Sequence, residues 1–272
     1  MTTVGSVCQR PITGRRKGFT LVELLAVIAV IAVLAALSAG AGTIAFRKAR
    51  NAKCQSNLKQ LGIALASYVG GRGHFPGSTN PEQFEDRTNA WSWPHSLERE
   101  MTGSDEFIPP RFRGDMKGTV WDCPGNVYVR NWPFAYGYNV TGMTSGLDQP
   151  PLGLGGKIRT FHMVGVPDPP QVPVSEGDIA NPSRMIALGD GASGWGDGSI
   201  WYSMNIARER PWADLKYYTA FNTSRHQGRL NVEFVDGHVE SAPLRQLFVD
   251  TIDEGMSVWN RDNLPHRERL PK

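Results

Sequence analysis

The sequence lacks the local motifs that many enzymes use to hold a metal ion, a phosphate or a nucleotide. It contains no His-Glu-x-x-His segment and no paired Cys-x-x-Cys segments, so spacing alone indicates no zinc site. The pair Gly156-Lys157 precedes isoleucine, which excludes a P-loop, and Ser193 lacks the second glycine of a hydrolase elbow. Residues 189–194 match Gly-x-Gly-x-x-Gly, but Trp195-Gly196-Asp197-Gly198 follows where a dinucleotide site needs a helix. We therefore expect no catalytic site and no cofactor.

Acidic side chains are absent from the first 18 residues, and the rest of the chain has almost no net charge. Four basic residues lie in that segment: Arg10, Arg15, Arg16 and Lys17. Without them, 25 basic and 26 acidic side chains remain of the 29 and 26 in the whole sequence. The formal charge of +3 thus belongs to the N-terminal segment, and no basic surface indicates nucleic-acid binding.

One long apolar run stands out, from Leu24 to Phe46. Its 23 residues carry no charge, and as a helix they are about 34 Å long, enough to span a hydrocarbon core of about 30 Å. Glu23 lies directly before this run. Because a carboxylate at the edge of a membrane segment is costly to bury without a partner, Glu23 is a candidate functional residue.

Three interpretations of this N-terminal segment compete. A secretory signal would be cut near Ala39-Gly40-Ala41, but the apolar run exceeds the usual length of about 7–15 residues. An uncleaved signal anchor explains the length of the apolar run but does not explain the presence of Gly18 and Glu23. Orientation is not decided by charge, because four basic residues precede the run and four follow it: Arg47, Lys48, Arg50 and Lys53.

The third interpretation comes from a resemblance. Residues 18–28, Gly18-Phe19-Thr20-Leu21-Val22-Glu23-Leu24-Leu25-Ala26-Val27-Ile28, resemble the N-terminal motif of bacterial type IV prepilins and type II secretion pseudopilins. The resemblance implies that a prepilin peptidase cuts after Gly18 and methylates Phe19. It also implies that Glu23 pairs with the new α-amine of Phe19 in a neighbouring subunit, which favours assembly because a buried charge gains a partner.

The same resemblance implies partners and a location. The partners are the prepilin peptidase, an assembly platform protein in the membrane, a cytoplasmic assembly ATPase and other pilin or pseudopilin subunits. The chain would be a single-pass protein of the inner membrane, with a cytoplasmic N-terminus and a periplasmic or extracellular C-terminal domain. It would then enter a filament, whether a secretion pseudopilus, a surface pilus or a DNA-uptake fibre.

The helix continues beyond the apolar run. Cys54, Leu58, Leu61, Leu65 and Tyr68 recur at helical spacing and predict one face that packs on a domain, with the helix ending at Gly70-Gly71. The expected plan is a leader at 1–18, a transmembrane part at 19–46, an amphipathic extension at 47–71 and a β-rich domain at 72–272.

The β-rich domain has short candidate strands and long turn-rich segments. The strands are Val127 to Val129, Met185 to Leu188, Ile200 to Met204, Leu230 to Val235 and His238 to Ser241. The expected fold is α+β, a long N-terminal helix packed on an antiparallel sheet with large loops, as in pilins. The insert at 80–118 and the tail at 245–272 match no pattern.

A β-hairpin is the sharpest local prediction. Leu230, Val232 and Phe234 alternate with polar residues, and Asp236-Gly237 then predicts a type I′ turn. In that register Phe234 pairs with Val239 on the core side. Glu233 and Glu240 are expected on the solvent side.

A second resemblance involves this hairpin. His226, nine residues and then Asp236-Gly237-His238 resemble the His-x9-Asp-Gly signature of a poorly characterised subset of prepilin-like proteins. Residues 54–62, Cys123-Pro124 and Tyr136-Gly137-Tyr138-Asn139 resemble other segments of that subset.

The sequence has three cysteines, and Cys8 would leave with the leader. Cys54 and Cys123 then remain as a pair, which suits an oxidising compartment. A disulfide and two unbonded buried thiols are both open interpretations.

Metal-binding residue types occur, but without a recognised spacing. His226, Asp190, Asp236 and His238 can ligate metals, although the turn itself requires Asp236. Calcium is the alternative at Asp190 to Asp197, where some major pseudopilins bind it in a C-terminal loop. We expect a structural pilin-like subunit without a resident metal. The alternative is a membrane-anchored binding protein or enzyme with its chemistry around Asp190, His226 and Asp236.

Overall fold

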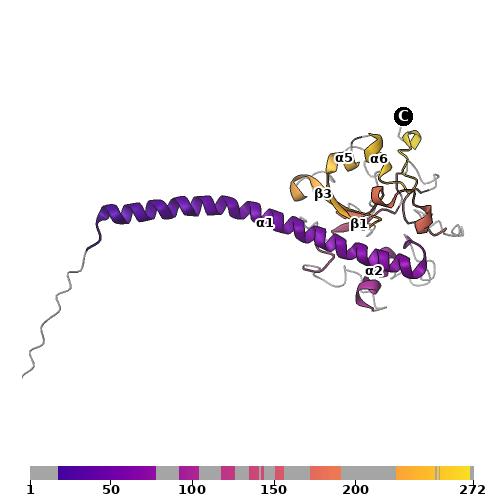
Figure 1. Cartoon of the computed structure of the whole chain (residues 1–272), viewed down its shortest axis with the longest axis horizontal. Helices are drawn as coiled ribbons and strands as arrows, with labels where there is room; N and C mark the ends of the chain where they lie inside the picture. The colour runs from indigo at the N-terminus through magenta and orange to yellow at the C-terminus, as the bar shows by residue number, and fades with distance from the viewer. Residues whose placement is uncertain are drawn as a thin grey trace, which may run out of the picture. The chain divides into compact units, whose positions relative to one another are not determined.

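The computed structural model describes residues 18–77, 92–103, 118–125, 135–140, 142–143, 151–155, 172–190, 225–248, 250 and 252–269. Helix α1 spans Leu21–Arg72 and is followed along the chain by a small domain of short strands and helices (Figure 1). The remaining elements are α2 (Ser92–Thr102), β1 (Tyr136–Tyr138), β2 (Ile186–Asp190), β3 (Arg229–Phe234), β4 (Val239–Pro243), α5 (Leu244–Phe248), α6 (Asp253–Ser257) and 3₁₀ turns at Glu176–Asp178, Pro182–Arg184, Arg225–Gln227 and Arg267–Arg269. The α+β, pilin-like fold class is confirmed.

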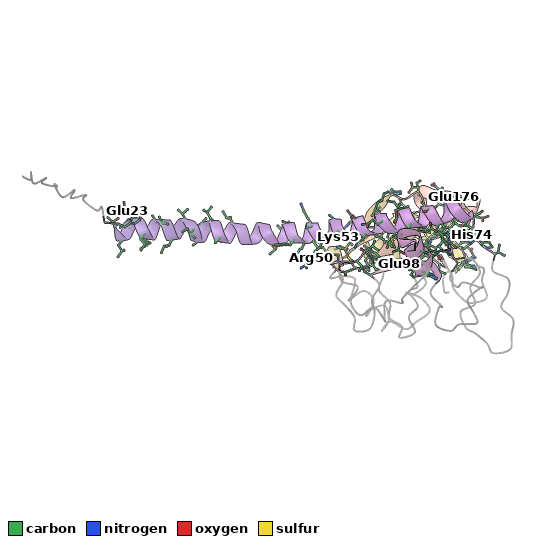
Figure 2. All side chains as sticks on the ribbon, turned by 90° about the horizontal axis from the view of Figure 1, so that it is seen from below. Glu23, Arg50, Lys53, His74, Glu98 and Glu176 are labelled. Atoms are coloured by element: carbon green, nitrogen blue, oxygen red, sulfur yellow. A yellow bond between two sulfur atoms is a disulfide. The ribbon has the colours of Figure 1, made fainter. Side chains whose placement is uncertain are left out.

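The first part of α1 is apolar and exposed. From Leu21 to Leu37 its large apolar side chains are about half to three-quarters exposed, and side chains project both above and below the ribbon beyond Glu23 in Figure 2. In the described part of the chain, α1 is the one helix long and apolar enough to cross a membrane. The chain divides into two compact units at Phe46 and Arg47, so the apolar part of α1 forms a unit of its own.

The second part of α1 belongs to the domain. Cys54, Leu58 and Leu61 are fully buried and Leu65 nearly so, which confirms the predicted packing face. The helix ends one residue later than predicted, at Arg72, because Gly73 adopts a positive φ of 76° and its N–H bonds the carbonyl of Val69. Gly73 is therefore the C-terminal cap of the helix.

Within the described residues, the sheet has four antiparallel strands in the order β1-β2-β3-β4. Three of the predicted strands correspond to β2, β3 and β4. Strand β1 was missed, because the sequence Tyr136-Gly137-Tyr138 is too short for an alternating pattern. The candidate strands Val127 to Val129 and Ile200 to Met204 lie outside the described residues.

Strand β3 is buried on both faces. Leu230, Val232 and Phe234 join a core with α5, α6 and Trp259, whereas Asn231 contacts α1 through a bond from Gln55 Nε2 to its Oδ1 of 3.2 Å. The C-terminal tail, which matched no pattern, therefore covers the face of the sheet opposite α1. In Figure 1, α5 and α6 lie on the far side of β3 from α1.

The hairpin between β3 and β4 differs from the prediction in its turn and its register. The N–H of Gly237 bonds the carbonyl of Phe234 and the N–H of Phe234 bonds the carbonyl of His238, which closes a three-residue loop. In this loop Gly237 has a positive φ and Asp236 does not, so the turn is a type I turn with a glycine bulge instead of type I′. Glu233 consequently pairs with Val239.

The solvent position predicted for Glu233 is wrong. Its side chain is 1% exposed and faces α1, because helix and tail together leave β3 without a solvent face. Glu240 on the edge strand β4 is exposed as predicted, with 61% of its side chain accessible.

Helix α2 gives part of the insert at 80–118 a role. Trp93 and Leu97 join the core on the α1 side of the sheet, and the Trp93 ring stacks on Tyr138 with centroids 5.5 Å apart. Glu100 accepts bonds from Ser67 (2.9 Å) and Arg72 (2.6 Å) of α1. The insert thus adds a helix against the end of α1.

Candidate functional site

Cys54 and Cys123 form a disulfide in the structure. The bond joins α1 to the segment 118–125 across a separation of 69 residues, and both cysteines are fully buried. The sequence left open whether these cysteines are bonded or are two buried thiols, and in the structure they are bonded. Loop closure of this length contributes about 4 kcal/mol to stability in the chain-entropy model.

His226 lies directly beside this disulfide. Its Nε2 is 3.3 Å from Cys123 Sγ and 3.4 Å from Asp190 Oδ2. The His226 side chain is 4% exposed and that of Asp190 is fully buried, and Asp190 Oδ2 also accepts the N–H of Asn231 at 2.7 Å. Helix α1, strand β2 and the turn before β3 thus supply one buried cluster.

The backbone around His226 is shaped to place this ring. His226 has φ 45°, in the left-handed region that costs energy for a residue with a side chain. Gly125 supplies the space, because a Cβ there would lie 2.7 Å from His226 Cε1. The Cys123-Pro124-Gly125 turn and His226 are therefore complementary in shape, which the sequence pattern did not show.

The other residues of the predicted hairpin signature lie at the turn. His238 Nδ1 is 2.5 Å from Asp236 Oδ1, and Asp236 Oδ1 also accepts the N–H of His238 at 3.1 Å. Gly237 takes the positive φ that closes the loop. The structure hence separates the predicted set, with His226 beside Asp190 and Asp236 beside His238.

Tyr136, Tyr138 and Asn139 tie β1 to its surroundings. The Tyr136 hydroxyl donates to the carbonyl of Cys54 at 3.3 Å, and the Tyr138 hydroxyl donates to the carbonyl of Pro76 at 3.2 Å. Asn139 Nδ2 donates to the carbonyls of Ile186 and Trp259. These residues connect α1, the sheet and the tail.

The calcium alternative is only partly covered by the structure. Of Asp190 to Asp197, Asp190 is described, and its Oδ2 is directed toward His226 and Asn231 inside the domain. The residues from 191 to 197 lie outside the described part of the chain.

At the other end of the chain, Gly18 and Phe19 precede α1 in an exposed, non-helical segment. Thr20 Oγ1 and Thr20 N–H both donate to Glu23 Oε2, at 2.7 and 2.8 Å, and Glu23 N–H donates to Thr20 Oγ1 at 3.3 Å. This reciprocal arrangement is a capping box that satisfies amides at the start of a helix.

The capping role of Glu23 was missed at the level of sequence. Its signal was Thr20-Leu21-Val22-Glu23, which matches Ser/Thr-x-x-Glu ahead of an apolar run. Within a single chain Glu23 therefore has a partner already. The bond between Gly18 and Phe19 lies outside the helix, in an exposed segment.

Comparison with known protein families identifies this segment. Residues 13–39 match the sequence model of the prokaryotic N-terminal methylation motif. The chain carries a prepilin-type N-terminal motif. The matched residues include Gly18, Phe19 and Glu23, and they run into the apolar part of α1.

A second family model matches the prepilin-like chain at residues 45–98 and is described as a protein of unknown function (DUF1559). It begins at the end of the apolar run and includes Cys54 and the packed face of α1. No curated protein and no solved structure is similar enough to match the chain. Neither family match reaches His226 to His238, so the resemblance of that segment stays a prediction.

These findings support a membrane-anchored, pilin-like subunit, without specifying the type of filament. The prepilin-type motif implies a processing peptidase and other pilins as partners. It is followed by an apolar helix and a folded C-terminal domain.

Proposed function

We propose that the chain is a structural subunit of a type II secretion pseudopilus or a type IV pilus-like filament. It is cut after Gly18 and methylated at Phe19, and it has no catalytic site of its own. The observation that carries the proposal is the prepilin-type motif at residues 13–39, because it continues without a break into an exposed apolar helix. An apolar helix stored in a membrane can repack against copies of itself in a filament core.

The geometry of the cut site supports processing. Gly18 has nothing within 4 Å of the position where a side chain would begin, and Phe19 is 75% exposed. Cleavage at this bond leaves Thr20 and Glu23 in place, so the capping box of α1 is retained in the mature chain.

The disulfide supports the proposed orientation. Disulfides persist in oxidising compartments, and the Cys54–Cys123 bridge lies in the domain that follows the apolar helix. We propose that the N-terminus faces the cytoplasm and that the domain faces the periplasm or the exterior.

The alternative, an anchored enzyme or binding protein, has less support. Its proposed chemistry involves Asp190, His226 and Asp236, yet the first two side chains are buried and Asp236 belongs to a turn. A substrate would meet a fully buried Asp190 and a His226 side chain that is 4% exposed. No cofactor is required for the structural role that we propose.

Mass spectrometry of the mature chain tests the proposal. Co-expression with a prepilin peptidase is expected to yield a chain that begins at N-methylated Phe19. The variant Gly18→Val should remain uncut, because a branched side chain blocks close approach at the scissile bond, and Gly14→Val is the matched control that should be processed normally. A chain that begins at Gly42, or that keeps Met1 in the presence of the peptidase, would overturn the proposal.

A further inference from the structure

Three potential metal-ligand atoms meet inside the domain. The Sγ atoms of Cys54 and Cys123 and a ring nitrogen of His226 all lie within 4.8 Å of one another. They come from α1, from the segment 118–125 and from the turn before β3, which are far apart in the sequence. Two thiolates and an imidazole are ligands that zinc prefers, and a metal bound by them would join the same elements as the disulfide.

We propose that Cys54, Cys123 and His226 form a zinc-type metal site when the disulfide is reduced. The two cross-links exclude each other, because bonded sulfurs lack the thiolate charge that binds the ion. The proposal goes beyond the function as a filament subunit and does not rest on it.

The spacing of His226 suits this site. Typical bond lengths of about 2.3 Å for Zn–S and about 2.0 Å for Zn–N place two tetrahedral ligands about 3.6 Å apart. The distance from His226 Nε2 to Cys123 Sγ is 3.3 Å while the disulfide is intact. Reduction therefore leaves the imidazole close to the position that it needs.

The imidazole is also held in place by its surroundings. The ring packs on Gly125, and the left-handed backbone of His226 directs it into the domain. Its side chain is 4% exposed, so the imidazole is largely shielded from solvent beside the two sulfurs. Preorganised and closed ligand sets are typical of structural zinc sites.

Asp190 contacts His226 at the edge of this set. Its Oδ2 is 3.4 Å from His226 Nε2. Two thiolates beside this buried carboxylate would place three negative charges together, and a divalent cation would neutralise most of them. Asp190 therefore favours a divalent cation at the three ligands without being one of them.

The chemistry balances with a dithiol as reductant. A dithiol donates two electrons and two protons to the Cys54–Cys123 bond, which breaks to two thiols while the reductant becomes a disulfide. Zinc then displaces the two thiol protons. A disulfide oxidant reverses the sequence, since it takes two electrons from the thiolates and releases the ion.

Cobalt(II) and zinc titrations of the full chain in detergent test the proposal. A Cys8→Ser background removes the leader thiol. The chain is unfolded and reduced with a phosphine, refolded without oxygen and titrated with cobalt(II). We expect one equivalent to bind with a thiolate-to-cobalt charge-transfer band and the intense visible bands of a tetrahedral site, and zinc should displace it. The oxidised form of the same chain should bind less than a tenth as much.

Variants separate this site from adventitious binding. His226→Gln should weaken cobalt binding at least tenfold, and Cys54→Ser with Cys123→Ser should abolish the charge-transfer band. His238→Gln is the matched control, because His238 lies in the turn between β3 and β4, outside the ligand group, and should leave the affinity unchanged. Circular dichroism checks that each refolded variant keeps its helix.

Three results would each overturn the proposal. One is equal cobalt binding by the reduced and the oxidised wild-type chain, a comparison that needs no substitution. Another is binding by the double cysteine variant with unchanged affinity. The last is an equal loss of affinity in His226→Gln and His238→Gln.

Discussion

The carboxyl group of Glu233 in β3 lies against the backbone of Gly62 in α1. A Cβ placed on Gly62 would be 1.6 Å from Glu233 Oε1, and the Glu233 side chain is 1% exposed. A residue without a side chain on the helix therefore makes room for an acid on the sheet. This contact is part of the packing between α1 and β3.

The variant Gly62→Ala should destabilise the domain by about 1–3 kcal/mol, because the buried carboxyl group has to move. Gly71→Ala is the matched control in the same helix. Nothing lies within 4 Å of a Cβ at Gly71, so this change should stabilise the helix by about 0.5–1 kcal/mol. Denaturant unfolding of both variants measures the difference. Equal stability of the two variants would contradict the observed packing.

The stability of the domain should fall as the pH rises from about 4.5 to about 9, in part because of Glu233. Burial raises the pKa of Glu233 to about 9 from its ordinary value of 4.5, although Lys59 and the Gly62 amide act in the opposite direction. Since the folded pKa is the higher one, the contribution of Glu233 is complete below pH 4.5 and is lost toward pH 9.

Glu233→Gln removes this titration. Its melting temperature should exceed that of the wild type at pH 8 and depend less on pH between 5 and 9. Glu240→Gln changes an exposed carboxyl group on the neighbouring strand and should leave the wild-type slope in place. Thermal unfolding across this pH range measures both slopes, and parallel curves for Glu233→Gln and the wild type would be the contrary result.

Glu23→Gln and Thr20→Val separate helix capping from assembly. Glutamine keeps the capping box but removes the charge, whereas valine at position 20 removes the bonding hydroxyl and keeps the charge. If Glu23 pairs with the α-amine of a neighbouring subunit, Glu23→Gln should lose filament incorporation at least tenfold and Thr20→Val should retain most of it. Immunoblotting of sheared filaments, with membrane-bound chain as the reference, measures incorporation. If Thr20→Val instead lost filament incorporation and Glu23→Gln retained it, Glu23 would act in helix capping alone.

Trp259→Ala should cost about 3–5 kcal/mol, because it empties part of the core between β3 and the C-terminal tail. Trp259 is fully buried, and its Nε1 donates to the carbonyl of Leu247 at 3.1 Å. Leu264→Ala alters a tail residue that is 55% exposed and should change stability by less than about 0.5 kcal/mol. Chemical denaturation compares the two. A small effect of Trp259→Ala would mean that the tail does not stabilise the sheet.

Much of the fold was predictable, because its patterns are local. The apolar run, the helical spacing from Cys54 to Tyr68 and the alternation in β3 each involve residues within a few turns or one strand. The hairpin turn was predicted at the right place but in the wrong class, since Asp-Gly suits more than one loop length. Strand β1 has three residues and depends on pairing with β2 for its conformation.

The sequence placed Asp190 and His226 in one candidate set, but it did not show that they lie beside the Cys54–Cys123 disulfide. His226 and Cys123 are separated by 103 residues, and no spacing rule connects a lone histidine to a lone Cys-Pro pair. Gly125 provided no signal either, because its role is to leave room for a ring from another segment. The burial of Glu233 was not predictable from the sequence either, because it requires α1 on one face of β3 and the C-terminal tail on the other.

The sequence by itself determined the prepilin-type motif, the membrane-length helix and the helix face that packs, because these depend on neighbours along the chain. Only the tertiary structure decided that Cys54 and Cys123 are bonded beside His226 and Asp190, that Glu233 is buried against Gly62 and that the C-terminal tail covers the sheet. Those features depend on which segments, far apart in the sequence, pack against one another and exclude water. The local sequence patterns do not specify these contacts.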